Sequence, residues 1–275
     1  MVLINSIEEL KNAYKGKKPS VGFIPTMGSL HDGHISLIKQ ARENNDIVVV
    51  SIFLNPTQFL VGEDLDKYPK KDDADKEICK LCGVDYLFMP DINTMYDKDE
   101  VLIKAPQINS FILEGAVRPS HFDGVLQVVL KLFNIVKPTN AYFGKKDAQQ
   151  LILITQMVKN LYLDINIIPC EIIRESDGLA YSSRNVYLSK AQREEALKIS
   201  QSINLAAKCI GKKQFNVKTI TKAMRSVLDS DQFSVEYIAI TNRKLQSIET
   251  VELQNSIILV AVKIGNTRLI DNIWI

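Results

Sequence analysis

The stretch Asp46–Leu54 (DIVVVSIFL) constrains the fold of this chain more than any other part of the sequence. It is apolar almost without interruption, so a strand formed by it has both of its faces buried. Strands of this kind occur in parallel sheets that helices cover on both sides. Shorter β-branched runs predict further strands at Val21–Ile24, Val84–Met89, Ala141–Phe143 and Ile165–Pro169.

Helical patterns separate these strands. Apolar residues recur at helical spacing in several segments, and one of these segments is apolar apart from a single polar stripe, as in a mostly buried helix. The repeated alternation of strand and helix predicts an α/β fold, a doubly wound (Rossmann-like) parallel sheet with right-handed crossovers. The predicted helices follow Gly33 and lie near Asp72–Cys82, Gly124–Lys137 and Asp147–Asn160.

The composition changes after Pro169. All nine prolines lie at or before this residue, and residues 170–275 contain none. Ser189 and Gln192 have the spacing of a capping box, which predicts the start of a helix. We therefore predict a first domain of residues 1–175 and a smaller α+β domain of residues 176–275. The second domain is expected to contain a further helix near Val217–Leu228 and strands at Phe233–Ile240, Ser256–Ile264 and Thr267–Trp274.

Composition and charge exclude several classes of protein. The 275 residues are 46% hydrophobic and 24% charged, which is typical of a globular chain and not of a disordered or collagen-like one. The formal charge of +2 supplies no basic field for non-specific nucleic-acid binding. Charged residues soon follow the apolar Met1–Ile4, unlike in a signal peptide, and the longest apolar run, Ile257–Val262, is too short to span a membrane. We expect a cytoplasmic protein.

Two of the four cysteines, Cys79 and Cys82, form a C-x-x-C pair. Such a pair is typical of a redox site or of half a zinc site. No second C-x-x-C and no histidine pair with zinc spacing follows it in the sequence. Because both cysteines share the apolar face of a predicted helix, we favour buried, reduced thiols, which agrees with a cytosolic compartment.

The strongest functional signal lies between Gly22 and Arg42. A predicted strand runs into Met27-Gly-Ser-Leu30, and His31-Asp-Gly-His34 then begins a helix. A helix N-terminus attracts phosphate, glycines let the backbone approach it, and imidazole N–H groups donate to its oxygens. In an open α/β sheet this turn lies at the carboxyl ends of the strands, where ligands bind. We predict an anion site; metal ligation or simple helix capping by Asp32 are the alternatives.

His121 is the third of the three histidines. We expect it in a loop before the helix that begins at Gly124. There it would either cap that helix or line a substrate pocket, and the sequence leaves both possibilities open.

Neutral amides follow the buried strand. Asn55 and Gln58 lie in a turn that contains Pro56, at the carboxyl edge of the predicted sheet. Amides are suited to recognising hydroxyl and carboxylate groups without adding charge. The alternative is ordinary turn chemistry, since Asn-Pro commonly begins turns.

A second strand end carries positive charge. Gly144 leads to Lys145, Lys146 and Asp147 at a predicted helix start. Lysines beside a helix N-terminus are suited to a polyphosphate, although no P-loop motif is present. Asp147 and Gln150 also have capping-box spacing, so both residues could serve only to cap the helix.

The segment Ile172–Asn185 lies at the predicted domain boundary. Its residues Tyr181-Ser-Ser-Arg184 place two hydroxyls and a guanidinium on one loop. Such a loop can bind phosphates and close as a lid. An ordinary polar linker is the alternative.

Five segments together resemble those of one family: PTMGSLHDGH, FLNPTQF, RPSHFDGV, FGKKDAQQ and SSRN. In this order and with similar spacing they resemble the pantoate–β-alanine ligases, nucleotidyltransferase-superfamily enzymes that share a HIGH-type motif with class I aminoacyl-tRNA synthetases. The resemblance covers nearly the whole chain. It implies that ATP and pantoate form a pantoyl adenylate with loss of pyrophosphate, and that β-alanine then attacks to release AMP and pantothenate. It also implies Mg²⁺ bound with ATP, which shields the phosphates, and a homodimer; no residue is assigned as a metal ligand.

The resemblance implies roles for individual residues. His31, His34, Lys146 and Arg184 would be catalytic, and His34 would be the proton donor, a role that we interpret as hydrogen-bond donation. Gln58 and Gln150 would bind pantoate, Gln58 would also bind β-alanine, and Asn55 and Arg118 would be peripheral. The ATP-binding residues would be Met27, Gly28, Ser29, Leu30, His31, Asp32, Gly33, His34, Gly144, Lys145, Lys146, Asp147, Ile173, Tyr181, Ser182, Ser183 and Arg184.

The chain departs from the family at Tyr181, where an aliphatic residue or methionine commonly precedes SSRN.

Three other functions compete with the one implied. Another adenylyl- or cytidylyltransferase would be shorter and would lack the GKKDAQQ segment, and a tRNA synthetase would need an anticodon-binding region. Intact His31, His34, Lys146 and Arg184 argue against a non-catalytic nucleotide-binding module.

Overall fold

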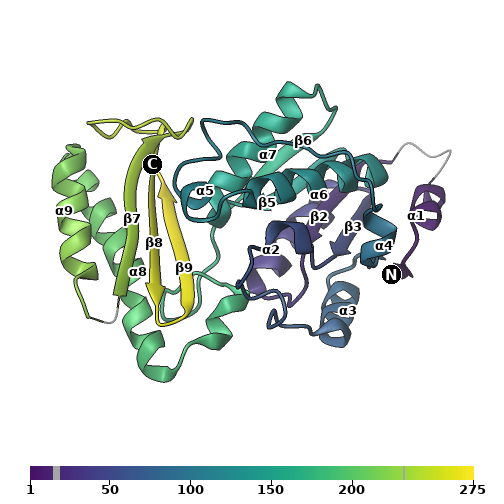
Figure 1. Cartoon of the computed structure of the whole chain (residues 1–275), viewed down its shortest axis with the longest axis horizontal. Coiled ribbons are helices and arrows are strands. Elements are labelled where there is room, and N and C mark those ends of the chain that lie inside the picture. Colours follow the sequence, from purple (N-terminus) through teal and green to yellow (C-terminus); the bar gives the residue numbers. More distant parts are fainter. Residues whose placement is uncertain (15–18, 232) are drawn as a thin grey trace. The chain divides into compact units, whose positions relative to one another are not determined.

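The computed structural model describes residues 1–14, 19–231 and 233–275 (Figure 1). The chain divides into two compact units: Met1–Gly144 with Leu153–Glu171, and Lys145–Ile152 with Ile172–Ile275. The predicted domains, 1–175 and 176–275, stay a prediction, because compactness does not test whether each part folds on its own.

The first unit contains a parallel sheet of six strands in the order β1-β4-β3-β2-β5-β6. From β2 the chain proceeds outward through β3 to β4 and then returns to the other side of β2 as β5. The strand order therefore reverses between β2 and β5, which is the topological switch point where such sheets bind ligands. The strands are β1 (Val2–Ile4), β2 (Val21–Thr26), β3 (Ile47–Ile52), β4 (Tyr86–Phe88), β5 (Asn140–Gly144) and β6 (Asn166–Cys170).

Helices cover both faces of this sheet, which confirms the predicted α/β fold. On one face, Ile38 of α2 and Cys79 of α3 belong to one buried cluster with Val48 and Val50 of β3. On the other face, the ring of Phe133 in α6 lies 6.4 Å from that of Phe23 in β2, centroid to centroid. The helices are α1 (Ile7–Ala13), α2 (Asp32–Asn44), α3 (Asp72–Leu81), α4 (Ile92–Met95), α5 (Glu114–Val117), α6 (His121–Val136) and α7 (Ala148–Asn160), with 3₁₀ turns η1 (Pro56–Gln58) and η2 (Lys145–Asp147).

Several boundaries differ from those predicted. Helix α6 begins at His121, three residues before the expected Gly124, so the prediction that His121 lies in a loop was wrong. Strand β4 is shorter than Val84–Met89 because the chain is still completing the turn after α3, where the Val84 N–H donates to the Cys79 carbonyl. The strand β1 and the helix α1 were missed. β1 has only three residues, of which Val2 is 54% exposed, and α1 has only seven, so neither segment produces a readable periodicity.

The second unit packs two helices against an antiparallel sheet with the strand order β7-β8-β9. Its core contains one face of the helix predicted to follow Ser189, with Ala196, Ile199, Ile203 and Ala206 all buried. The capping box is present, with the Gln192 N–H donating to Ser189 Oγ at 3.2 Å. The elements are η3 (Ser183–Tyr187), α8 (Lys190–Gly211), α9 (Val217–Leu228), β7 (Phe233–Asn242), β8 (Ser256–Ile264) and β9 (Thr267–Trp274).

All four cysteines are free thiols, and Cys79 is fully buried. Burial, with the nearby Asp75 carboxylate, raises the pKa of Cys79 to about 12, so it stays protonated at neutral pH. Cys82 is only partly buried, contrary to the prediction, because it is the C-terminal cap residue of α3.

Among the described residues, no helix is both long and apolar enough to cross a membrane.

Candidate active site

The turn between β2 and α2 follows the carboxyl end of a central strand. Thr26 Oγ1 donates to the Ser51 carbonyl at 2.8 Å and accepts from the Gly28 N–H at 3.3 Å, so β3 and the turn are tied to the end of β2. Gly28 and Ser29 both have left-handed backbone angles, φ +85° and +53°. A side chain at Gly28 would be strained, and its Cβ would lie 3.1 Å from both Asp75 and Ile52.

Asp75 of α3 holds this turn in place. Its two carboxylate oxygens accept from the backbone N–H groups of Ser29 and Leu30, each at 2.7 Å. The side chain is 1% exposed, and burial raises its pKa while the two backbone hydrogen bonds oppose that rise. We had not singled out Asp75 from the sequence. The available signal was an acidic residue on the apolar face that also carries Ile78, Cys79 and Cys82.

The two histidines lie together at the start of α2. His31 is the N-cap residue, a position that the sequence had suggested for Asp32, and the ring centroids of His31 and His34 are 4.1 Å apart. The His31 backbone N–H donates to His34 Nδ1 at 3.3 Å. A neutral His34 ring that accepts at Nδ1 carries its proton on Nε2 and can donate from there. The helix N-terminus and the imidazole together form a candidate anion site.

Gln58, at the end of η1, is held beside this turn. Its Oε1 accepts from Asn55 Nδ2 at 3.1 Å, and its Nε2 donates to the sulfur of Met27 at 3.2 Å. Asn55 is 1% exposed and also donates to the Gly124 carbonyl of α6. A thioether is a weak acceptor, so a ligand oxygen can replace it on Gln58. The first unit thus brings the predicted pantoate residue to the predicted ATP-binding turn.

His121 fixes the main chain of Gln58. Its Nδ1 donates to the Gln58 carbonyl at 2.7 Å, and its Nε2 accepts from Arg118 at 3.0 Å. A carbonyl can only accept, so the neutral ring is the Nδ1–H tautomer. Burial, together with the charge of Arg118, lowers the pKa of His121 to about 4. Of the two predicted roles, capping is ruled out by these contacts, while lining a substrate pocket stays a prediction.

Two further contacts surround η1, one between Arg118 and Glu63 and one between η1 and α6. Arg118 binds both carboxylate oxygens of Glu63, each at 2.6 Å. Burial raises the pKa of Glu63, but the hydrogen bonds and charge of Arg118 lower it, and the pKa falls below its usual value. A Cβ on Gly124 would lie 2.3 Å from the Thr57 carbonyl oxygen, so only glycine permits this approach. Arg118, predicted to be peripheral, thus contacts the backbone of Gln58 as well, at 3.3 Å.

Gly144 ends β5, and η2 follows it directly. Strand β5 pairs with β2 at Gly22↔Asn140 and Phe23↔Ala141, and Gly144 pairs with Cys170 of β6 at the carboxyl end of β5. In the second unit, Lys146 Nζ lies 3.7 Å from Asp147, and Gln150 is partly buried in α7. Because α7 begins at Ala148, Asp147 and Gln150 keep the capping-box spacing, and their roles in binding stay predictions.

The segment before η3 forms a short hairpin within the second unit. Arg174 and Ala180 form an antiparallel bridge, and the Tyr181 N–H donates to the Ile173 carbonyl at 3.1 Å. Ser182 Oγ accepts from the Arg184 N–H at 3.3 Å. The hairpin therefore brings Ile173 next to Tyr181, the position where this chain departs from the family, through a main-chain hydrogen bond.

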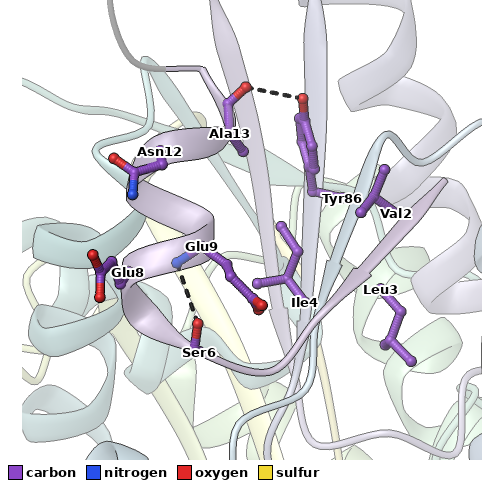
Figure 2. Close-up of a pocket in the computed structure, with 9 residues that line it drawn as sticks. All are labelled: Val2, Leu3, Ile4, Ser6, Glu8, Glu9, Asn12, Ala13 and Tyr86. Atoms are coloured by element: carbon purple, nitrogen blue, oxygen red, sulfur yellow. Dashed lines mark hydrogen bonds between the residues drawn. The ribbon is translucent and has the colours of Figure 1, made fainter.

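A hollow of about 740 Å³ lies elsewhere, between β1 and α1 (Figure 2). Its lining includes Glu8, Glu9 and Tyr86, whose hydroxyl donates to the Ala13 carbonyl at 3.2 Å. No predicted site residue lines it. Its carboxylates would repel phosphate, so we do not assign it to nucleotide binding.

Comparisons with known proteins agree with the resemblance. A family model described as pantoate-beta-alanine ligase matches residues 2–274. Pantothenate synthetases of Aliarcobacter butzleri (strain RM4018) and Sulfurimonas denitrificans (strain ATCC 33889 / DSM 1251) are 60% and 56% identical over 275 residues, covering 100% of each chain.

Solved structures of the same family match as well. A pantothenate synthetase from Thermus thermophilus has a TM-score of 0.95 at 36% identity and covers 100% of this chain and 99% of its own. A pantoate-beta-alanine ligase from Francisella tularensis, complexed with beta-gamma ATP and beta-alanine, has a TM-score of 0.81 at 38% identity, with coverages of 100% and 97%.

The fold and the histidine turn define an α/β enzyme of the doubly wound type with its candidate anion site at the switch point. More particularly, the chain belongs to the pantoate–β-alanine ligase family. It is therefore a ligase of pantothenate biosynthesis.

A first prediction concerns Asp75. In Asp75→Asn one of the two backbone N–H groups loses its acceptor, which should cost about 1–3 kcal/mol of stability. We expect weaker binding of inorganic pyrophosphate because the turn is no longer held. Asp73→Asn, an exposed position on the same helix, should change neither property and serves as the control. Equal thermal stability and pyrophosphate affinity in wild type and Asp75→Asn would contradict this role.

A second prediction concerns the pH dependence of stability. Between about pH 6.5 and pH 4 unfolded His121 binds a proton that the folded ring does not, so stability falls as the pH falls. Above about pH 6.5 this effect vanishes. His121→Asn cannot titrate, so from about pH 7.5 to about pH 4.5 the wild type should lose roughly 2–3 kcal/mol more than the variant. Urea unfolding at both pH values measures this, and parallel losses would contradict a buried neutral His121.

Proposed function

We propose that this chain joins pantoate to β-alanine in two steps that consume ATP. A pantoate carboxylate oxygen attacks the α-phosphorus, the bond to the β-phosphate breaks, and pyrophosphate leaves. The β-alanine nitrogen then attacks the acyl carbon of the pantoyl adenylate, AMP leaves, and the nitrogen loses a proton to give pantothenate. The observation that carries the proposal is the His31–His34 pair at the N-terminus of α2, at the switch point of the sheet.

The main barrier to the first step is repulsion between the carboxylate and the phosphates. We assign His31, His34, Lys146 and Arg184 to offsetting the charge that builds on the phosphoryl oxygens. The tautomer of His34 supports this assignment, since its Nε2–H is a preorganised donor. The remaining ATP contacts are assigned to Met27–Asp32, Gly33, Gly144, Lys145, Asp147, Ile173, Tyr181, Ser182 and Ser183 by resemblance.

Gln58 and Gln150 are assigned to pantoate, and Gln58 also to β-alanine. The contact of Gln58 Nε2 with the Met27 sulfur supports this, because binding of a substrate oxygen there would connect the pantoate residue to the ATP-binding turn. The Francisella relative, whose structure contains beta-gamma ATP and beta-alanine, supports these two compounds as substrates. A homodimer in the cytoplasm is part of the same proposal and rests on the resemblance.

Mg²⁺ would be carried by the phosphates of ATP. The described residues contain no group of three or more His, Cys, Asp or Glu side chains that could hold a metal ion. Phosphate oxygens and water are the usual ligands of Mg²⁺ with nucleotides. When bound, the ion would shield the negative charge of the phosphates.

A third prediction tests the two-step reaction. Radiolabelled pyrophosphate should exchange into ATP in the presence of pantoate and in the absence of β-alanine, because the first step is reversible before the amine arrives. Other carboxylic acids at the same concentration serve as controls and should support little exchange. Exchange that appears only after β-alanine is added would contradict an adenylate intermediate.

A fourth prediction concerns His34. His34→Ala should lower turnover by roughly 10²–10³-fold, the scale for the loss of one preorganised donor. His34→Gln retains an N–H donor and should recover part of the loss. Ser36→Ala, which removes a hydrogen bond to the Gly33 carbonyl in the same helix, controls for local disturbance of α2. If Ala and Gln at position 34 lose equal activity over a wide pH range, hydrogen-bond donation is the wrong explanation and true acid catalysis is favoured.

A further inference from the structure

Asn272, near the end of β9, contacts the turn that carries the two lysines. Its side chain is 2% exposed, and its Nδ2 donates to two successive carbonyls, those of Lys145 at 2.9 Å and Lys146 at 2.7 Å. All three residues belong to the second unit. A side-chain amide has two hydrogens on one nitrogen, so it can satisfy both carbonyls at once. A carboxylate of the same size has no donor for either.

The preceding residue, Asp271, holds a second segment. It is 3% exposed, and its two oxygens accept from Arg174 at 2.7 and 3.0 Å. Arg174 also donates to the Gly178 carbonyl, inside the hairpin that joins Ile173 to Tyr181. The Asp271 carboxylate further accepts from the Asn272 N–H at 2.8 Å, which links the two contacts. Two successive residues of β9 thus bind two segments that are far apart in the sequence: Asp271 binds Arg174 of the hairpin, and Asn272 binds the lysine turn.

Lys146 depends on its backbone for its position. Its ammonium group is the end of a four-carbon chain, and its ion pair with the exposed Asp147 spans 3.7 Å. A contact of this kind between partly exposed groups contributes little to holding a long side chain. The carbonyls bound by Asn272 belong to Lys146 itself and to its neighbour, so they define where the side chain starts.

We propose that Asn272 and Asp271 are positioning residues for ATP. Asn272 orients the backbone from which Lys146 reaches the phosphates, and Asp271, through Arg174, orients the hairpin of Ile173 and Tyr181. This rests on the proposed function, which assigns Lys146, Ile173 and Tyr181 to ATP. Preorganised groups act only when held close to the productive geometry, and a displacement of about 1 Å can cost about 10²-fold in rate.

The kinetic test compares Asn272→Asp, Asn272→Ala and the control Asn216→Ala. Asn216 caps α9 in the same unit, so its loss destabilises the protein without touching Lys145 or Lys146. Asn272→Asp keeps the volume and replaces both donors by a charge that repels the carbonyls. We expect kcat/KM for ATP to fall by about 10²-fold in Asn272→Asp and less in Asn272→Ala, with a much smaller change in the pantoate KM. Asn216→Ala should lower the melting temperature and leave both kinetic constants unchanged.

A spectroscopic test is independent of activity. Trp274 is the only tryptophan of the chain, and Lys145 Nζ lies 5.8 Å from the centre of its ring. If Asn272 holds the turn, Asn272→Asp should shift the Trp274 emission as Lys145→Met does, and the double variant should add no further shift. Additive shifts, or wild-type kinetics in folded Asn272→Asp, would overturn the proposal. A wild type without pantoate-dependent turnover would instead overturn the proposed function, while the emission test still decides whether Asn272 holds the turn.

Discussion

The site depends on one buried carboxylate. Asp75 accepts from the N–H groups of Ser29 and Leu30, and these bonds hold a turn in which Ser29, unlike Gly28 a residue with a side chain, has a left-handed φ of +53°. The turn determines where α2 begins and therefore where its N-terminus and the two histidines lie. The acceptor on α3 thus adds to the hydrogen bonds of Thr26, which tie the same turn to the end of β2.

The same principle recurs at the other predicted functional residues. His121 and Arg118 bind the carbonyl of Gln58, and Asn272 binds the carbonyls of Lys145 and Lys146. In each case a polar side chain holds the main chain of a predicted functional residue. Because a buried polar group is costly unless it is paired, these contacts are specific in geometry as well as stabilising.

Much of the fold could be predicted from the sequence. The apolar stretch 46–54 indicated a strand with both faces buried, and β3 (Ile47–Ile52) is the third strand from the edge of a parallel sheet. The helix Val217–Leu228 and the last two strands were predicted at their observed limits. The start of α6 was not. His121 was expected in a loop, and it is the first residue of the helix. Its bond to the Gln58 carbonyl joins residues that no local pattern connects.

The sequence by itself determined which residues follow the carboxyl ends of the strands, since strand and helix periods depend on near neighbours along the chain. It therefore identified the H-x-x-H turn, the Asn55–Gln58 turn and the lysine turn. Only the tertiary structure decided which buried polar groups hold these turns. Asp75, His121 and Asn272 act on segments 45, 63 and 126 residues away, and hydrogen bonds over such separations depend on how the strands are ordered, which no periodicity records.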